Sequence, residues 1–151
     1  MNIDRFKYRI WDKYLREMNY ISLDEIAGDT YFWFDGKTVQ EYVFNDCLKE
    51  RQRFIIGQCT GLKDKYNTFI YEGDIVNIYA ERYSYAKEIK NALVMYNEQG
   101  VTLEICDDNG DIHFFSDYEP SEEIEIIGNI FENSDLVVNS QKEWWNQRYE
   151  K

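Results

Sequence analysis

Short segments in which apolar and polar residues alternate run through most of the chain, and turn-forming residues separate them. At residues 5–11, Phe6, Tyr8 and Ile10 alternate with basic residues, which is typical of a half-buried β-strand. Further runs rich in Ile, Val, Phe and Tyr follow as far as residue 131. The pattern predicts a mainly β protein with short helical segments.

The clearest pattern lies at residues 54–78, where FIIGQCTGLKDKYNTFIYEGDIVNI predicts three strands separated by turns. Gly61 can adopt a positive φ, and the charged residues before Asn67 favour a solvated bend. Glu72 and Asp74 stand in the next turn, and we interpret both as turn carboxylates in water. Paired carboxylates also serve acid–base chemistry, but that requires a shifted pKa, for which the sequence shows no cause.

Two dipeptides predict β-hairpins. Asp35-Gly36 follows a run of four aromatic residues at 31–34, and Asn109-Gly110 separates two apolar segments, which favours a primed two-residue turn. The aromatic run fits either core packing, which we favour, or base stacking as in single-strand binders. His113, the single histidine, follows the second turn, and we interpret it as a surface or hydrogen-bonded histidine.

Calcium binding is an alternative interpretation of the spacing Asp107, Asn109 and Asp111. An EF-hand loop beginning at Asp107 would need Gly at its sixth position and Glu at its twelfth. Those positions hold Ile112 and Tyr118, so the spacing fails as a calcium motif. The sequence also lacks a P-loop, a dinucleotide glycine fingerprint and a metal-ligand cluster, and we expect no metal and no cofactor.

Three separated motifs resemble the YopX family of phage and prophage proteins. They are RIWDK at 9–13, FIIGQCTGLKDK at 54–65 followed by YEGDIV at 71–76, and IIGNIFEN at 126–133. The chain departs from the family at Tyr66-Asn67, where Asn-Gly is usual, and at Cys59, where an aromatic residue is usual. The resemblance implies a small β-barrel of SH3-like type and a phage origin. It implies no activity and no catalytic residues.

From these patterns we expect three parts. Residues 1–53 form a β-rich segment packed on the core, residues 54–135 form an SH3-like barrel, and residues 136–151 form a tail with a short helix. Within the barrel we expect residues 54–56 to lie beside residues 125–130. The tail either docks on its own barrel or contacts another subunit or partner, through which the protein would oligomerise.

Composition predicts a soluble, cytosolic protein, and the YopX resemblance implies that the cytoplasm is that of a host bacterial cell. Apolar residues make up 44% of the chain, yet none of its apolar runs reaches membrane-spanning length, and the opening residues are charged. Its cysteines, Cys47, Cys59 and Cys106, are odd in number and lack a CxxC spacing. We expect all of them to be reduced, unpaired thiols.

Charge is unevenly distributed along the chain. The net charge is −12, and the stretch from Asn91 to Gln141 holds twelve carboxylates but no Lys or Arg. Such a surface repels nucleic acid and favours encounter with a basic protein, or it only keeps the protein soluble. The residues we predict to contact a partner are Asp107, Asp108, Asp111, Glu122, Glu123, Glu125, Trp144 and Trp145.

Three functions are therefore open. The leading one is a non-enzymatic protein-interaction module of a phage, without membrane or nucleic-acid binding. The second is an acidic mimic of nucleic acid that inhibits a host DNA-binding protein. The third is an enzyme whose carboxylates come together from separate strands. A mixed surface with many ion pairs favours the first, a continuous acidic face the second, and a cleft with several buried acids the third.

Overall fold

The structure is a computed structural model, and it describes residues 7–22, 33–34, 37–38, 53–82, 85–97 and 102–149. The chain divides into two compact units, Met1–Cys59 and Thr60–Lys151, which we call the N-terminal and C-terminal units. The division falls inside β5 (Phe54–Lys63), so the first residues of that strand belong to the N-terminal unit.

The N-terminal unit contains an antiparallel arrangement of β2 (Glu17–Ser22), β1 (Lys7–Asp12) and the start of β5. Ile10 lies opposite Ile56, and Asp12 lies opposite Phe54. The expected strand is confirmed over residues 7–12, but it is not half-buried, because Arg9 is buried as well as Ile10. Residues 54–58 pair with β1, and residues 124–129 pair with residues 74–78, so the expected adjacency of residues 54–56 and 125–130 stays a prediction.

A small hairpin joins β3 (Trp33–Phe34) to β4 (Lys37–Thr38), with Trp33 opposite Thr38. This pairing confirms the hairpin predicted from Asp35-Gly36. The rest of the aromatic run and the cysteine at position 47 lie outside the described residues. The choice between core packing and base stacking therefore stays a prediction.

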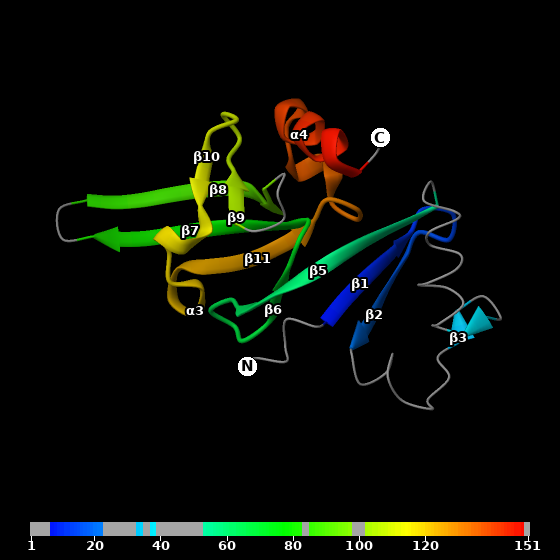
Figure 1. The fold of residues 1–151 in the computed structure, drawn as a ribbon. Coiled ribbons are helices and arrows are strands. Elements are labelled where there is room, and N and C mark those ends of the chain that lie inside the picture. The colour runs from blue at the N-terminus through cyan, green and yellow to red at the C-terminus, as the bar shows by residue number, and fades with distance from the viewer. Residues whose placement is uncertain are drawn as a thin grey trace. The chain divides into compact units, whose positions relative to one another are not determined.

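The C-terminal unit is built on an antiparallel five-stranded sheet in the order β10-β9-β8-β7-β11, which curls into a half-barrel (Figure 1). Its strands are β7 (Asp74–Arg82), β8 (Tyr85–Tyr96), β9 (Leu103–Cys106), β10 (Ile112–Phe114) and β11 (Ile124–Asn129). A further strand, β6 (Phe69–Tyr71), pairs with β5. The mainly β prediction is confirmed.

Short helices η3 (Phe115–Asp117) and α3 (Pro120–Glu123) lie between β10 and β11. The helices η4 (Ser134–Leu136) and α4 (Asn139–Tyr149) follow β11. Alternate residues of each strand face inward, and in this unit those residues are apolar. Its buried members are Ile70, Val76, Ile78, Ala80, Ile89, Ala92, Val94, Ile105, Phe115, Tyr118 and Ile124. Each large side chain buried in this way stabilises the fold by roughly 1.5–3 kcal/mol.

The segment from Glu81 to Lys90 is polar and charged, but it is not a long connection between strands. Most of it belongs to β7 and β8, which pair as far as Arg82 opposite Tyr85. Ile89 is buried while its charged neighbours are exposed, so the segment is a strand with one solvated face.

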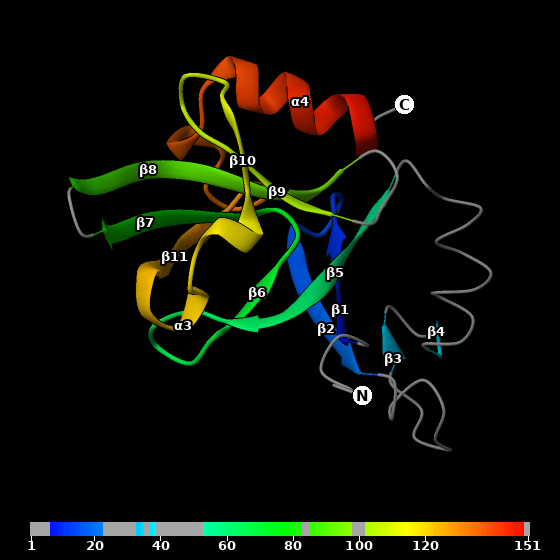
Figure 2. The same ribbon diagram turned by 60° about the vertical axis from the view of Figure 1, so that its left-hand side comes forward.

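The C-terminal helix α4 docks on its own unit, beside β8 and β9 (Figures 1 and 2). Trp145 is 3% exposed, and its ring packs edge-on against Phe131 with centroids 5.4 Å apart. The buried Gln141 amide donates from Nε2 to the carbonyls of Asn91 (2.7 Å) and Cys106 (2.8 Å). Of the two expectations for the tail, docking on its own unit is confirmed.

Candidate functional site

The hairpin that joins β9 to β10 is organised around a buried carboxylate. Asp107 Oδ1 accepts hydrogen bonds from the backbone N–H of Asn109 (3.0 Å) and of Asp111 (2.9 Å). The N–H of Gly110, which has φ +86°, donates to the carbonyl of Asp107 (3.0 Å). The predicted primed turn is wrong, because Asn109 lacks the positive φ that such a turn requires, and Asp107 supports a longer loop instead.

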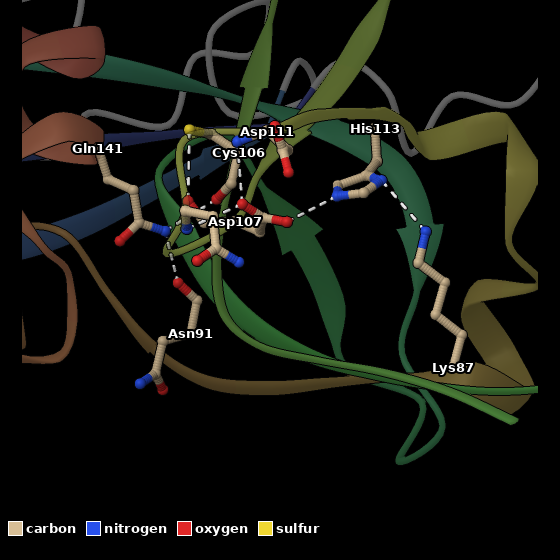
Figure 3. Close-up of polar contacts among 8 residues, drawn as sticks. Lys87, Asn91, Cys106, Asp107, Asp111, His113 and Gln141 are labelled. Carbon is tan, nitrogen blue, oxygen red and sulfur yellow. Dashed lines mark hydrogen bonds and ion pairs between the residues drawn. The ribbon is translucent and has the colours of Figure 1, made fainter.

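The same carboxylate binds the imidazole of β10. Asp107 Oδ2 lies 2.8 Å from His113 Nε2, and His113 Nδ1 lies 3.3 Å from Lys87 Nζ (Figure 3). An ammonium group can only donate, so Nδ1 accepts and the ring proton sits on Nε2, which donates to Asp107. The expectation of a hydrogen-bonded histidine is confirmed. Burial raises the pKa of Asp107, but hydrogen bonds from His113, Asp111 and Asn109 together outweigh it and lower that pKa.

The neighbouring thiol is unsuited to nucleophilic chemistry. Cys106 is buried, and its Sγ lies 3.7 Å from the carbonyl oxygen of Asp107. Burial, followed by the charges of Asp107 and Asp111, raises the pKa of Cys106 to about 11, so the thiol stays protonated at neutral pH. Cys59 is buried as well. The prediction that all cysteines are unpaired stays a prediction, since Cys47 lies outside the described residues.

The outer side of this hairpin combines apolar and acidic side chains. Ile112 is 45% exposed and Phe114 is 54% exposed, and as alternate residues of β10 they project on the side opposite His113. Asp108 and Asp111 in the loop before β10 are exposed. The residues predicted to contact a partner do not include these two apolar side chains, although their alternation about His113 in so short a strand is a signal in the sequence.

The acidic residues predicted around α3 have different environments. Glu122 is exposed. Glu123 is buried, and its Oε2 accepts a hydrogen bond from the backbone N–H of Glu119 at the start of the helix (2.8 Å). Glu125 forms an ion pair with Lys65. Glu122 is therefore the carboxylate of this group that faces solvent most fully.

The predicted tryptophans also differ. Trp145 lies in the interior of the C-terminal unit, whereas Trp144 is half-buried, with the Arg148 guanidinium 4.9 Å from its ring centroid. Arg148 also approaches Glu104 (3.7 Å). The structure thus places Asp107, Glu123 and Trp145 inside the fold and leaves Asp108, Asp111 and Glu122 at the surface. Contact of the surface group with a partner stays a prediction.

Comparison with known proteins identifies the family. A sequence model of the YopX protein matches residues 7–138. The chain belongs to the YopX family. Among proteins of curated function, none matches the sequence.

Two solved structures are similar to this YopX chain. Protein yopX of Bacillus subtilis has a TM-score of 0.50 at 16% identity, covering 89% of this chain and 99% of its own. Protein EF1440 of Enterococcus faecalis has a TM-score of 0.46 at 22% identity, covering 87% of this chain and 97% of its own. At such identity, the likeness to the Bacillus protein shows a shared fold and carries no activity.

The YopX motifs hold carboxylates that bind the backbone. In RIWDK, the buried Asp12 accepts from the N–H of Tyr14 (2.8 Å) and of Leu15 (3.1 Å), and it pairs with Arg53 Nη2 (2.7 Å). Burial raises the pKa of Asp12, but the Arg53 hydrogen bond and the two backbone bonds together lower it. This side chain closes the turn between β1 and β2.

The central motif contains three more buried carboxylates. Asp64 accepts from the N–H of Tyr66 (3.0 Å) and of Thr68 (2.9 Å) through Oδ1, and from Ile126 N–H (3.1 Å) through Oδ2. Glu72 Oε1 accepts from Tyr96 N–H (3.3 Å). Asp74 Oδ2 accepts from Tyr71 N–H (2.7 Å).

The interpretation of Glu72 and Asp74 as turn carboxylates in water is therefore wrong, because both are buried against backbone donors. The YopX motif carboxylates serve as acceptors for turns and strand ends. Within the ranges that the structure describes, no group of three or more His, Cys, Asp or Glu could hold a metal ion. None of the helices described there is long and apolar enough to cross a membrane.

Proposed function

We propose that this YopX protein is a non-enzymatic interaction module that binds a basic protein through its β9–β10 hairpin. The observation that carries the proposal is the exposure of Ile112 and Phe114 beside the exposed carboxylates of Asp108 and Asp111. Apolar side chains at the centre of a charged rim are the usual anatomy of a protein interface. Complementary charge then guides the encounter with a basic partner.

The acids that lie deepest in the fold support a binding role over a catalytic one. Asp64, Glu72, Asp74 and Glu123 each accept backbone hydrogen bonds, and Asp107 binds both the backbone and His113. A carboxylate that holds a turn together in this way is already occupied as an acceptor and is poorly placed to act as a general base.

The ion pairs of the acidic span favour a protein-interaction module over a nucleic-acid mimic. Lys65 pairs with Glu125, and Arg148 approaches Glu104. These cations, which lie outside the stretch from Asn91 to Gln141, offset the charge of two of its carboxylates. A mimic of DNA needs a more continuous row of unpaired carboxylates.

The proposal includes the wider expectations that the YopX family brings. We propose a phage or prophage origin, action in the cytoplasm of the host cell, and a relationship of the curled sheet to SH3-like barrels. We also propose that the protein has no affinity for DNA or RNA, because the hairpin segment supplies carboxylates where phosphate binding needs Lys and Arg.

A selection from a library of random linear peptides, displayed and captured on the immobilised protein, tests the proposal. We expect the captured peptides to be enriched in Lys and Arg, with binding that weakens as salt rises. A variant with Asp108→Asn, Asp111→Asn and Glu122→Gln should lose this enrichment. All three positions are exposed, so the fold should remain intact.

A matched control removes the same charge elsewhere, through Glu17→Gln, Glu81→Gln and Asp135→Asn, which are also exposed positions. This control should capture the same basic peptides as the unaltered protein. Capture of peptides without basic enrichment, or equal loss in both variants, would overturn the proposed site. If the protein instead bound tightly to a protein that binds double-stranded DNA, and DNA competed with this binding, the nucleic-acid mimic would be favoured.

A further inference from the structure

We propose that the basic partner binds as an extended segment that adds a β-strand to the outer edge of β10. This inference rests on the proposed function and specifies how the partner is held. In such complexes backbone hydrogen bonds supply affinity, and alternate side chains of the added strand supply specificity. The occupant is a segment of another protein that carries Lys or Arg on both sides of a short apolar or β-branched centre.

The two edges of the five-stranded sheet differ in their backbone pairing. At the β11 edge, Ile126 N–H donates to Asp64 Oδ2 (3.1 Å), and Ile124 C=O accepts from Lys65 N–H (2.9 Å). At the other edge, β10 is the outermost strand of the sheet among the described residues. An edge strand of this kind is a template for pairing with another chain.

The register shows which backbone groups of β10 face outward. Asp107 N–H donates to Asp111 C=O (3.0 Å), so this is a hydrogen-bonded position of the antiparallel hairpin. Hydrogen-bonded and non-bonded pairs alternate along such a ladder, which makes Ile105 and His113 the next bonded pair. The N–H groups of Ile112 and Phe114 therefore point away from β9, toward the open edge.

Charge decides what kind of strand this edge accepts. Exposed carboxylates lie on both sides of β10, at Asp108 and Asp111 before it and at Asp117 and Glu119 after it. A second copy of this chain would bring the same carboxylates together, and like charges on paired strands are destabilising. A segment with basic residues at both ends would instead place opposite charges together.

The deciding experiment compares Phe114→Pro with Phe114→Ala, using basic peptides from the library selection. Proline removes the outward N–H, and Phe114 has φ −80° and ψ 130°, which proline tolerates. Alanine removes the same aromatic ring but keeps the N–H. We expect the proline variant to bind roughly fivefold more weakly than the alanine variant, which is the effect of one hydrogen bond.

Amide exchange gives a second measurement that does not depend on a variant. Peptide binding should slow the exchange of the backbone N–H groups of Ile112 and Phe114. The N–H of His113 points toward β9 and should be protected already in the free protein. Equal affinities for the two variants, or no added protection, would overturn strand addition while leaving the basic interaction site standing. Failure to select basic peptides would overturn the proposed function itself.

Discussion

The two edges of the five-stranded sheet in the C-terminal unit differ in how the backbone of the outermost strand is paired. The β11 edge is covered by the bend after β5, whose Asp64 carboxylate and Lys65 N–H bind Ile126 and Ile124. The β10 edge presents Ile112 and Phe114 to solvent. One edge is closed by specific hydrogen bonds, and the other, in the part of the chain that the structure describes, is an outermost strand with exposed carboxylates before and after it.

Closing an edge with a carboxylate requires that the carboxylate be fully satisfied. Asp64 is 3% exposed and accepts three backbone hydrogen bonds, two within its own bend and one from β11. An unsatisfied acceptor at this depth would cost about 1–3 kcal/mol. Asp108 and Asp111, beside the open edge, do not have that requirement because they are exposed.

The closed edge coincides with the YopX motifs, and the open edge does not. Asp64 belongs to FIIGQCTGLKDK and Ile126 belongs to IIGNIFEN, whereas the hairpin at 103–114 lies between motifs. In this chain the motif carboxylate Asp64 therefore serves the fold. The proposed binding function lies at the other edge of the sheet.

The largest expected effect comes from opening the closed edge. Asp64→Ala removes three backbone hydrogen bonds and exposes the edge of β11, so we expect a loss of about 3 kcal/mol in the free energy of unfolding. Urea unfolding measures it. The matched change at the open edge, Asp111→Ala, should stay within about 0.5 kcal/mol of the unaltered protein. Similar losses at both positions would remove the contrast between the edges.

The local parts of this fold could be predicted from sequence. Asn67 has φ +66° in the predicted bend, and the alternating segments formed strands. Gly61 has the positive φ (+78°) that glycine permits, although it lies within β5 and not in a turn. The burial of Asp64 could not be predicted, because it depends on Ile126, 62 residues later in the chain. Sequence patterns locate turns well, but they do not show which distant strand a turn will cover.

The candidate site shows the same limit. Asn109-Gly110 correctly predicts a hairpin, yet the loop geometry depends on the carboxylate of Asp107, which the charge pattern places at the surface. In the fold Asp107 contacts His113, and Gln141 donates a hydrogen bond to the carbonyl of the neighbouring Cys106, 35 residues earlier in the chain. The acidic residues that we predict from charge to contact a partner therefore include buried and exposed side chains, and only the structure distinguishes the two groups.

A smaller effect is expected inside β11, the strand of the closed edge. A Cβ added at Gly128 would lie 2.5 Å from Asn133 Oδ1, which accepts the N–H of Asn129 (3.2 Å). Gly128→Ala should therefore lower the free energy of unfolding by about 2 kcal/mol. Combining it with Asn133→Gly should recover part of that loss in urea unfolding. No recovery would show that the strain lies elsewhere.

Acidification should weaken the inner support of the open edge. The pKa of Asp107 in the fold lies below its ordinary value of 3.8, so its contribution to stability is complete above that value and falls as pH decreases through the lowered pKa. Asp107→Asn should cost about 1 kcal/mol near pH 7. Its stability should then fall less than that of the unaltered protein below about pH 4.

The control for this pH series is Asp108→Asn, at an exposed position in the same loop. It should follow the unaltered protein at every pH, and any acid sensitivity left in Asp107→Asn should come in part from Asp12, whose pKa is also lowered. A steeper loss in Asp107→Asn than in the unaltered protein would contradict the assigned sign.

The smallest expected effect is at the surface of β10 itself. Ile112→Lys and Phe114→Lys exchange exposed apolar side chains for charged ones, so each should change the free energy of unfolding by no more than about 0.5 kcal/mol. The same exchange at Ile124 of β11, which is fully buried, should prevent stable folding because it places an unpaired charge in the core. If Phe114→Lys were instead as damaging as Ile124→Lys, the ring of Phe114 would be part of the core, and β10 would no longer be an open edge held ready for a partner.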